Sequence, residues 1–138
     1  MKKMKKIKLY KFKMFNKKSG KLVPVDFSRI FPTSVKRIFY IYGKKNMYRG
    51  DHAHRKCSQF FIPISGKIDI VTTTRQKKKS YILNFKKKNA LYVPPMIWCR
   101  LKFLDKNSIV LVVCDRRYEF GDYIETYKEF LDLEKNRK

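Results

Sequence analysis

Two histidines, His52 and His54, are the only imidazoles in this 138-residue chain, and they stand two positions apart behind Arg49 and Gly50. Side chains two apart on a β-strand project from the same face, so a strand here would point both rings the same way. Imidazole both accepts and releases protons near neutral pH. The pair therefore predicts proton-transfer chemistry, with a purely structural role for both rings as the alternative.

The elements that must hold these histidines are predicted to be β-strands. Apolar and polar residues alternate with a period of two from Lys6 to Met14, as expected of a strand with one buried face. Breaks rich in Gly, Pro, Asn, Ser or Lys separate further segments of this kind. The predicted strands cover residues 6–14, 21–27, 36–42, 59–64, 67–73, 81–85, 90–93, 97–103 and 108–114. Short strands at this spacing are typical of an antiparallel sandwich or barrel.

Only the C-terminal part has a helical pattern. Apolar side chains recur at helical spacing from Tyr123 to Leu131, and Asp122 with Glu125 three residues later has the spacing of a capping box. We therefore expect a helix over about residues 122–134. The sequence has no repeat and no linker, so residues 1–138 are predicted to form one all-β domain, a barrel of antiparallel strands with a short C-terminal helix.

The charge of the chain is strongly positive, with 35 Lys and Arg against 11 Asp and Glu and a formal net charge of +24. Such a charge is compatible with nucleic-acid binding. The lysines, however, recur in pairs and triplets along the chain, mostly where turns are expected, and no known nucleic-acid-binding motif surrounds them. We therefore predict a lysine-rich solvated surface and no nucleic-acid partner, with a basic nucleic-acid-binding protein as an alternative.

Hydrophobic residues make up 43% of the chain, enough for a folded core, yet no run approaches the roughly 18 apolar residues of a membrane span. Lysines interrupt the apolar residues behind the basic N-terminus, so no secretory signal and no membrane association are predicted, and we expect a cytoplasmic location. The cysteines, Cys57, Cys99 and Cys114, include no CxxC pair and are expected to stay reduced.

The spacing around the histidines is typical of one superfamily. His52 and His54 are followed by Gln59 and a glycine in the pattern H-x-H-x4-Q-x6-G, which resembles the first cupin motif, where two His and a Glu bind a metal inside a jelly-roll barrel. Residues 92–99 resemble the second cupin motif, with Cys99 in place of its His. An amide and a thiol suit Fe or Mn poorly. We expect metal-free use of the histidines, with a His2Cys zinc site as the alternative.

A longer resemblance covers nearly the whole chain. The pattern RGxHAH…Q…G…LYVPPxxW…DYI…F, from Arg49 to Phe130, is similar to that of the sugar 3,4-ketoisomerases. Members of that family move the carbonyl of dTDP-4-dehydro-6-deoxy-glucose from C4 to C3, on the way to 3-amino-3,6-dideoxy sugars of bacterial surface polysaccharides. The resemblance implies a cupin jelly roll that forms a homodimer, binds a dTDP-linked 4-keto-6-deoxy sugar and needs no metal or other cofactor.

The residues fit that reaction physically. Moving the ketone requires removal of the C3 proton, an enediol or enediolate, and delivery of a proton to C4. By resemblance, His52 is the main acid/base residue and His54 assists it or orients the substrate. The enediolate needs hydrogen-bond donors, and alternation over residues 37–42 places Tyr40 and Tyr42 on one face. We nominate Tyr40 as the catalytic phenol and Tyr42 as a substrate contact, with aromatic packing as the alternative.

Three further residues are predicted to bind the substrate. Arg49 can hold a phosphate oxygen bidentately, and Gln59 can orient a group near the histidines. Trp98 can stack on thymine, although packing is its alternative role. An epimerase on the same barrel is the alternative activity. The family's D-x-R-G-x-L turn is replaced by residues 17–22, KKSGKL, which leaves the gluco or galacto configuration of the product open.

Overall fold

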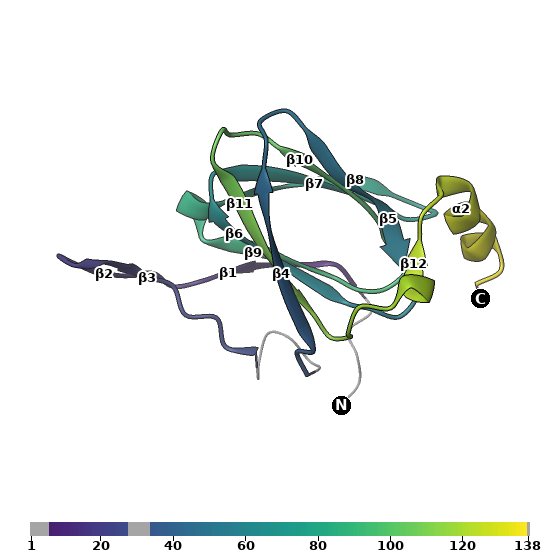
Figure 1. Ribbon diagram of the computed structural model, residues 1–138, viewed down its shortest axis with the longest axis horizontal. Coiled ribbons are helices and arrows are strands. Elements are labelled where there is room, and N and C mark those ends of the chain that lie inside the picture. The colour runs from purple at the N-terminus through teal and green to yellow at the C-terminus, as the bar shows by residue number, and fades with distance from the viewer. Residues whose placement is uncertain (1–5, 28–33, 138) are drawn as a thin grey trace.

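The computed structural model describes residues 6–27 and 34–137, which form two antiparallel β-sheets and a C-terminal helix (Figure 1). The first sheet has the strand order β1 (Lys8–Lys11), β9 (Asn89–Val93), β6 (Gln59–Ser65), β11 (Ser108–Cys114) and β4 (Arg37–Gly43). The second has the order β12 (Tyr123–Ile124), β5 (Tyr48–His54), β10 (Trp98–Phe103), β7 (Lys67–Thr73) and β8 (Lys78–Asn84). The remaining elements are a hairpin, two short 3-10 turns and one helix. The hairpin consists of β2 (Phe15–Lys17) and β3 (Gly20–Leu22), the turns are η1 (Phe85–Lys87) and η2 (Phe120–Asp122), and the helix is α2 (Tyr127–Lys135).

The core lies between the two sheets and follows from the alternation in the sequence. In β7, Ile68 and Ile70 are fully buried while Lys67 is exposed and Asp69 only half-buried. The inward side chains of both sheets meet in one apolar cluster that includes Leu91, Val110 and Val112. Burial of such side chains stabilises each by about 1.5–3 kcal/mol relative to exposure.

The outer face of the first sheet is also covered, although only in part. The segment after β1 packs Phe12, Val23 and Val25 against Phe60 and Ile62 of β6. The hairpin β2–β3 that interrupts this segment projects away from the sheets, at the end of the molecule opposite helix α2 (Figure 1). Residues 17–22, the turn that differs from the family pattern, therefore lie far from α2 in this chain.

The two sheets form a jelly-roll sandwich rather than the closed barrel predicted from the sequence. Within the part of the chain that the structure describes, the edge strand β4 has no ladder with β5, which the two-residue strand β12 covers only at Ala53 and His54. Backbone hydrogen bonds therefore do not close the sandwich along this side. The antiparallel, all-β architecture with one C-terminal helix is confirmed.

Several boundaries differ from the sequence prediction. The strand expected over residues 21–27 ends at Leu22, and β5, which carries the histidines, had not been assigned as a separate strand. Helix α2 begins at Tyr127, five residues later than predicted, because Thr126 rather than Asp122 is its N-cap and accepts a hydrogen bond from the Glu129 backbone N–H at 3.2 Å. No helix in residues 6–27 or 34–137 is long and apolar enough to cross a membrane.

A bulge in β5 determines which of its side chains face the core. Opposite β10, Cys99 pairs with His52 and Leu101 with Arg49, so the register shifts by one residue between them. Gly50, with φ 90°, accommodates this shift. Arg49 and His52 thus lie on the inner face together although they are three residues apart, which simple alternation does not predict.

Replacing Gly50 with Ala should destabilise the protein by about 1–3 kcal/mol, because a Cβ would lie 3.0 Å from the Cys99 carbonyl oxygen at a φ that side chains disfavour. Urea denaturation measures this loss. Gly121→Ala is the matched control, since its Cβ would meet nothing within 4 Å. Equal stability of the two variants would contradict the assigned role of the bulge.

Candidate active site

A cavity of about 790 Å³ opens where β4 and β5 leave the sandwich unclosed. Its polar lining comes from both sheets, with Arg37, Arg49, His52, Gln59 and Tyr123. Its apolar lining includes Phe39, Phe61 and Leu101. Among the described residues that line it, two are arginines and none is acidic, so the cavity suits an anionic ligand.

His52 lines this cavity and is half-buried. Burial lowers the pKa of its imidazole below the ordinary 6.5, and a hydrogen bond with the Gly50 backbone opposes this only in part. The ring is therefore neutral at pH 7. One ring nitrogen is then left with a lone pair that can accept a proton.

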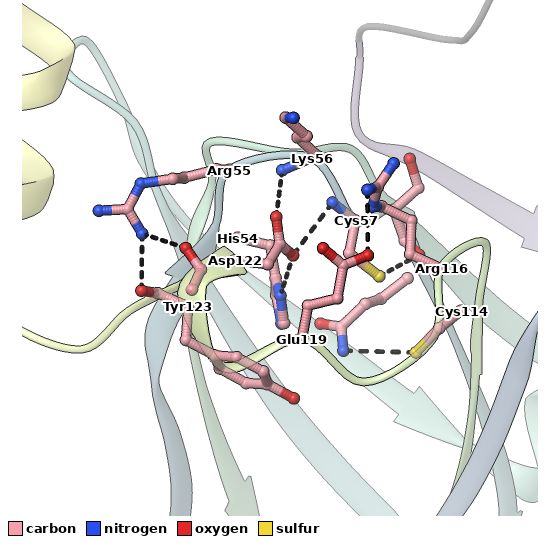
Figure 2. A network of polar contacts seen from close by, with 12 residues as sticks. His54, Arg55, Lys56, Cys57, Cys114, Arg116, Glu119, Asp122 and Tyr123 are labelled. Carbon is pink, nitrogen blue, oxygen red and sulfur yellow. Dashed lines mark hydrogen bonds and ion pairs between the residues drawn. The ribbon is translucent and has the colours of Figure 1, made fainter.

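His54 lies directly behind His52, with 5.1 Å between the ring centroids, and is 7% exposed. Its Nδ1 lies 2.9 Å from Asp122 Oδ2 (Figure 2). Burial again lowers the imidazole pKa, and the bond to Asp122 opposes the shift. Its other nitrogen, Nε2, is buried and has no hydrogen-bond partner among the described residues. The predicted pairing of the two imidazoles is thus what the structure shows, although only His52 lines the cavity.

Tyr123 provides a phenol beside both histidines. Its ring centroid lies 4.4 Å from that of His54 and 5.2 Å from that of His52. Arg37 Nη1 donates a hydrogen bond to the Tyr123 hydroxyl oxygen at 3.3 Å. Because that oxygen accepts from Arg37, its own proton is free to be donated to a ligand.

The segment that carries Asp122 and Tyr123 is fixed to β5 by Arg55. Arg55 Nη1 donates to the carbonyl oxygens of Gly121 at 3.0 Å and Tyr123 at 2.8 Å, and its Nη2 forms an ion pair with Glu129 of α2. Strand β12 pairs with β5 in the register that places Tyr123 opposite His54. The C-terminal segment therefore completes the site.

Gln59 is buried at the cavity wall, where its Nε2 donates to Cys114 Sγ at 3.8 Å. The neighbouring Cys57 thiol and Cys114 are hydrogen-bonded, which raises the pKa of Cys57 and lowers that of Cys114. The hydrogen bond to the Cys114 sulfur therefore holds the Gln59 amide in place. Arg49, also predicted to bind substrate, is exposed at the cavity mouth.

Tyr40 and Tyr42 border the cavity, but their side chains lie mainly outside it. Phe39 and Ile41 pack against the core, so the alternate positions lie on the outer face of β4. The two rings are 61% and 73% exposed. The tyrosine whose ring contacts both histidines is Tyr123, which we had placed in the C-terminal helix.

Trp98 corrects another prediction. It does not line the histidine cavity, and its ring packs against Tyr127 and Phe130 of α2 with centroid distances of 5.4 and 5.8 Å. The side chain thus packs against α2 of the same chain, whereas the packing expected as its alternative role was at a dimer interface. The alternation along β10 agrees with this packing, because Cys99 points inward and Trp98 therefore lies on the opposite, outer face of the strand.

The protonation states of the cysteines suit a metal poorly. Burial raises the pKa of the Cys99 thiol to about 12, so it is a neutral thiol unless a cation binds beside it. In the described part of the chain, the potential ligand atoms of His54, Cys57 and Asp122 lie within 4.8 Å of one another. The Asp122 oxygens, however, already accept backbone N–H groups, and the Cys57 pKa is raised.

Comparisons with known proteins agree on one family. The family model FdtA, described as WxcM-like, C-terminal, matches residues 5–135. A TDP-4-oxo-6-deoxy-alpha-D-glucose-3,4-oxoisomerase from Aneurinibacillus thermoaerophilus is 27% identical over 89% of this chain and 88% of its own length. The 3'-monoepimerase ChmJ from Streptomyces bikiniensis shares the fold alone. Its TM-score is 0.77 with 10% identity, over 85% of this chain and 67% of its own.

Two solved structures are similar over almost their full lengths. The sugar 3,4-ketoisomerase QdtA from Thermoanaerobacterium thermosaccharolyticum, in complex with TDP, has a TM-score of 0.86 and 30% identity over 94% of each chain. The TDP-fucose-3,4-ketoisomerase WlaRA from Campylobacter jejuni has a TM-score of 0.82 and 34% identity over 93% of this chain and 95% of its own. The resemblance found in the sequence is confirmed: this chain belongs to the FdtA family, together with the sugar 3,4-ketoisomerases.

Proposed function

We propose that this protein is a dTDP-4-dehydro-6-deoxy-glucose 3,4-ketoisomerase that moves the carbonyl from C4 to C3 by histidine acid/base catalysis. The observation that carries the proposal is the placement of His52 and Tyr123 at a cavity that is lined by two arginines, with the His54 ring in contact with both. Relatives support the substrate, because QdtA also binds TDP-4-keto-6-deoxyglucose as a histidine-to-asparagine variant.

The reaction moves protons and leaves the redox state of the sugar unchanged. A base removes the proton from C3 while an acid protonates the C4 carbonyl oxygen, which gives an enediol. Protonation of C4 and loss of the proton from the C3 oxygen then form the C3 ketone. The site must therefore handle one proton at carbon and one at oxygen.

His52 is the residue proposed to carry the carbon-bound proton. It lines the cavity, and its neutral ring presents a lone pair that can take the C3 proton and return it at C4. Tyr123 and His54 are proposed to serve the oxygens. The phenol can donate to the developing enediolate, and His54 Nε2 is an unoccupied acceptor behind it.

The nucleotide diphosphate is proposed to bind Arg49 at the cavity mouth. Its guanidinium is exposed there and can form a bidentate contact with phosphate oxygens. Gln59, held by Cys114, can orient a sugar hydroxyl from the cavity wall. No cofactor is needed, because every proton transfer has a side chain that can perform it.

The proposal includes a homodimer in the cytoplasm. Exposed apolar side chains gather on the outer face of edge strand β4, with Ile38 at 59%, Tyr40 at 61% and Tyr42 at 73% exposure. An unpaired strand edge beside such a face favours association with a second copy. The exposure of Tyr40 and Tyr42 is then explained by an interface.

Incubation with dTDP-4-dehydro-6-deoxy-glucose in deuterated water should yield a 3-keto sugar with label at C4, detected by NMR. His52→Ala should keep the fold and lose turnover. An intact protein that produces no 3-keto sugar would falsify the ketoisomerase assignment. Exchange at C3 or C5 without movement of the carbonyl would favour the epimerase, and the C4 configuration of the product separates the gluco from the galacto outcome.

A pair of phenylalanine variants tests the assignment of the phenol. Tyr123→Phe removes a hydroxyl that lies beside the histidines and should lower kcat by about 10²–10³-fold. Tyr40→Phe removes the same group from an exposed ring and should change kcat less than twofold, as expected of a group outside the reacting centre. The reverse order of the two effects would restore Tyr40 as the catalytic phenol.

The pH dependence should follow from the lowered pKa values of His52 and His54. Since the neutral rings are active, kcat/KM should stay level down to about pH 6.5 and fall only below it. The folded state binds fewer protons than the unfolded one there, so its stability also decreases as pH drops through that range. An acid limb centred above pH 7 contradicts this expectation.

A further inference from the structure

Asp122 is buried, and its carboxylate makes three contacts that all require it to accept. The Lys56 backbone N–H donates to Oδ1 at 2.7 Å, and the Cys57 backbone N–H donates to Oδ2 at 3.3 Å. Backbone amides can only donate, so they fix both oxygens as acceptors. His54 Nδ1, at 2.9 Å from Oδ2, must therefore supply a proton to make its hydrogen bond (Figure 2).

This geometry determines the tautomer of His54. A neutral imidazole carries one N–H, and the hydrogen bond to Asp122 places it on Nδ1. The lone pair is then at Nε2, on the opposite side of the ring. Nε2 is buried and unpartnered among the described residues. A buried acceptor without a donor is costly in a folded protein, so a neighbouring hydroxyl group is expected to donate to it.

The surroundings of His54 restrict what that donor can be. His52 and Tyr123, both at the cavity, contact its ring with centroid distances of 5.1 and 4.4 Å. Arg37, Asp122 and Cys57 are the other charged or titratable groups near it. Arg37 donates to the Tyr123 oxygen rather than to the imidazole. Since His54 does not line the cavity, the Tyr123 hydroxyl is the donor that fits.

We propose that Asp122 is a positioning residue of this site, which holds His54 as the Nδ1–H tautomer so that Nε2 accepts a hydrogen bond from the Tyr123 hydroxyl, the group that exchanges protons with the substrate oxygens during isomerisation. The inference rests on the proposed function and adds a residue that the sequence had assigned to a helix cap. In the first step, His52 removes the proton from C3 while the Tyr123 hydroxyl gives its proton to the C4 oxygen. When the ketone forms at C3, His52 returns its proton to C4 and the proton on the C3 oxygen passes to the Tyr123 oxygen, whose hydroxyl again donates a hydrogen bond to Nε2.

The tautomer is measured directly by long-range 1H–15N correlation NMR on protein labelled with 15N-histidine. Only two histidines are present, and His52→Asn leaves His54 as the sole signal. The expected wild-type spectrum has a protonated Nδ1 and an unprotonated Nε2 at pH 7.5. A protonated Nε2 would overturn the inference without any activity measurement.

Asp122→Asn tests the consequence for catalysis. Its amide would face Nδ1 as a donor, so the ring should change to the Nε2–H tautomer. We expect kcat to fall by about 10²–10⁴-fold with KM within a few-fold of wild type. Asp122→Glu, which restores a carboxylate, should recover part of kcat together with the Nδ1–H signal.

Asp115→Asn is the matched control, because Asp115 Oδ1 likewise accepts a backbone N–H, that of Ser58, at 2.8 Å. It should lower stability while leaving the His54 tautomer unchanged. If Asp122→Asn does not fold, the wild-type spectrum and the Asp122→Glu variant still decide the question. An inactive wild-type protein overturns the proposed function, whereas an active enzyme with unaffected kcat in Asp122→Asn overturns this inference alone.

Discussion

The carboxylate of Asp122 is the group on which the arrangement of this site depends. It joins the backbone after β5 to the turn before β12, and it orients the His54 ring at the same time. Because hydrogen bonds to a charged acceptor are stronger than those between neutral groups, these contacts can hold the two chain segments together. The position of Tyr123 follows, since it is the next residue and pairs with His54 across the β12–β5 ladder.

The sandwich is open along one side, which leaves a cavity beside the residues that Asp122 holds in place. β4 and β5 are not paired in the described part of the chain, and a cavity lies between them whose floor is the core and whose walls carry Arg37 and His52. The bulge at Gly50 then turns Arg49 inward as well. Arg49 at the mouth and His52 in the wall thus come from one short strand, β5.

The surface of the protein and the site differ in their charge. The net charge of +24 comes mainly from lysines spread over exposed turns and strands. On the outer face of the second sheet, Lys102 and Arg100 lie over the Tyr48 ring at 5.4 and 4.3 Å. At the cavity, by contrast, burial keeps both histidines neutral. The groups proposed to carry out the chemistry are therefore two neutral imidazoles in a very basic chain.

The sequence by itself determined the antiparallel strands, the family and the facing pair of imidazoles, because period-two alternation and a fixed spacing such as His52-x-His54 act within one strand. It did not determine the partners of those rings. Asp122 has the local spacing of a helix cap, yet it lies 68 positions from the His54 that it contacts. Tyr40 satisfied the alternation rule, but alternation alone does not say which face of an edge strand is inside. The open edge, the bulge and the docking of β12 decided these points, since each depends on how segments distant in the chain meet in space.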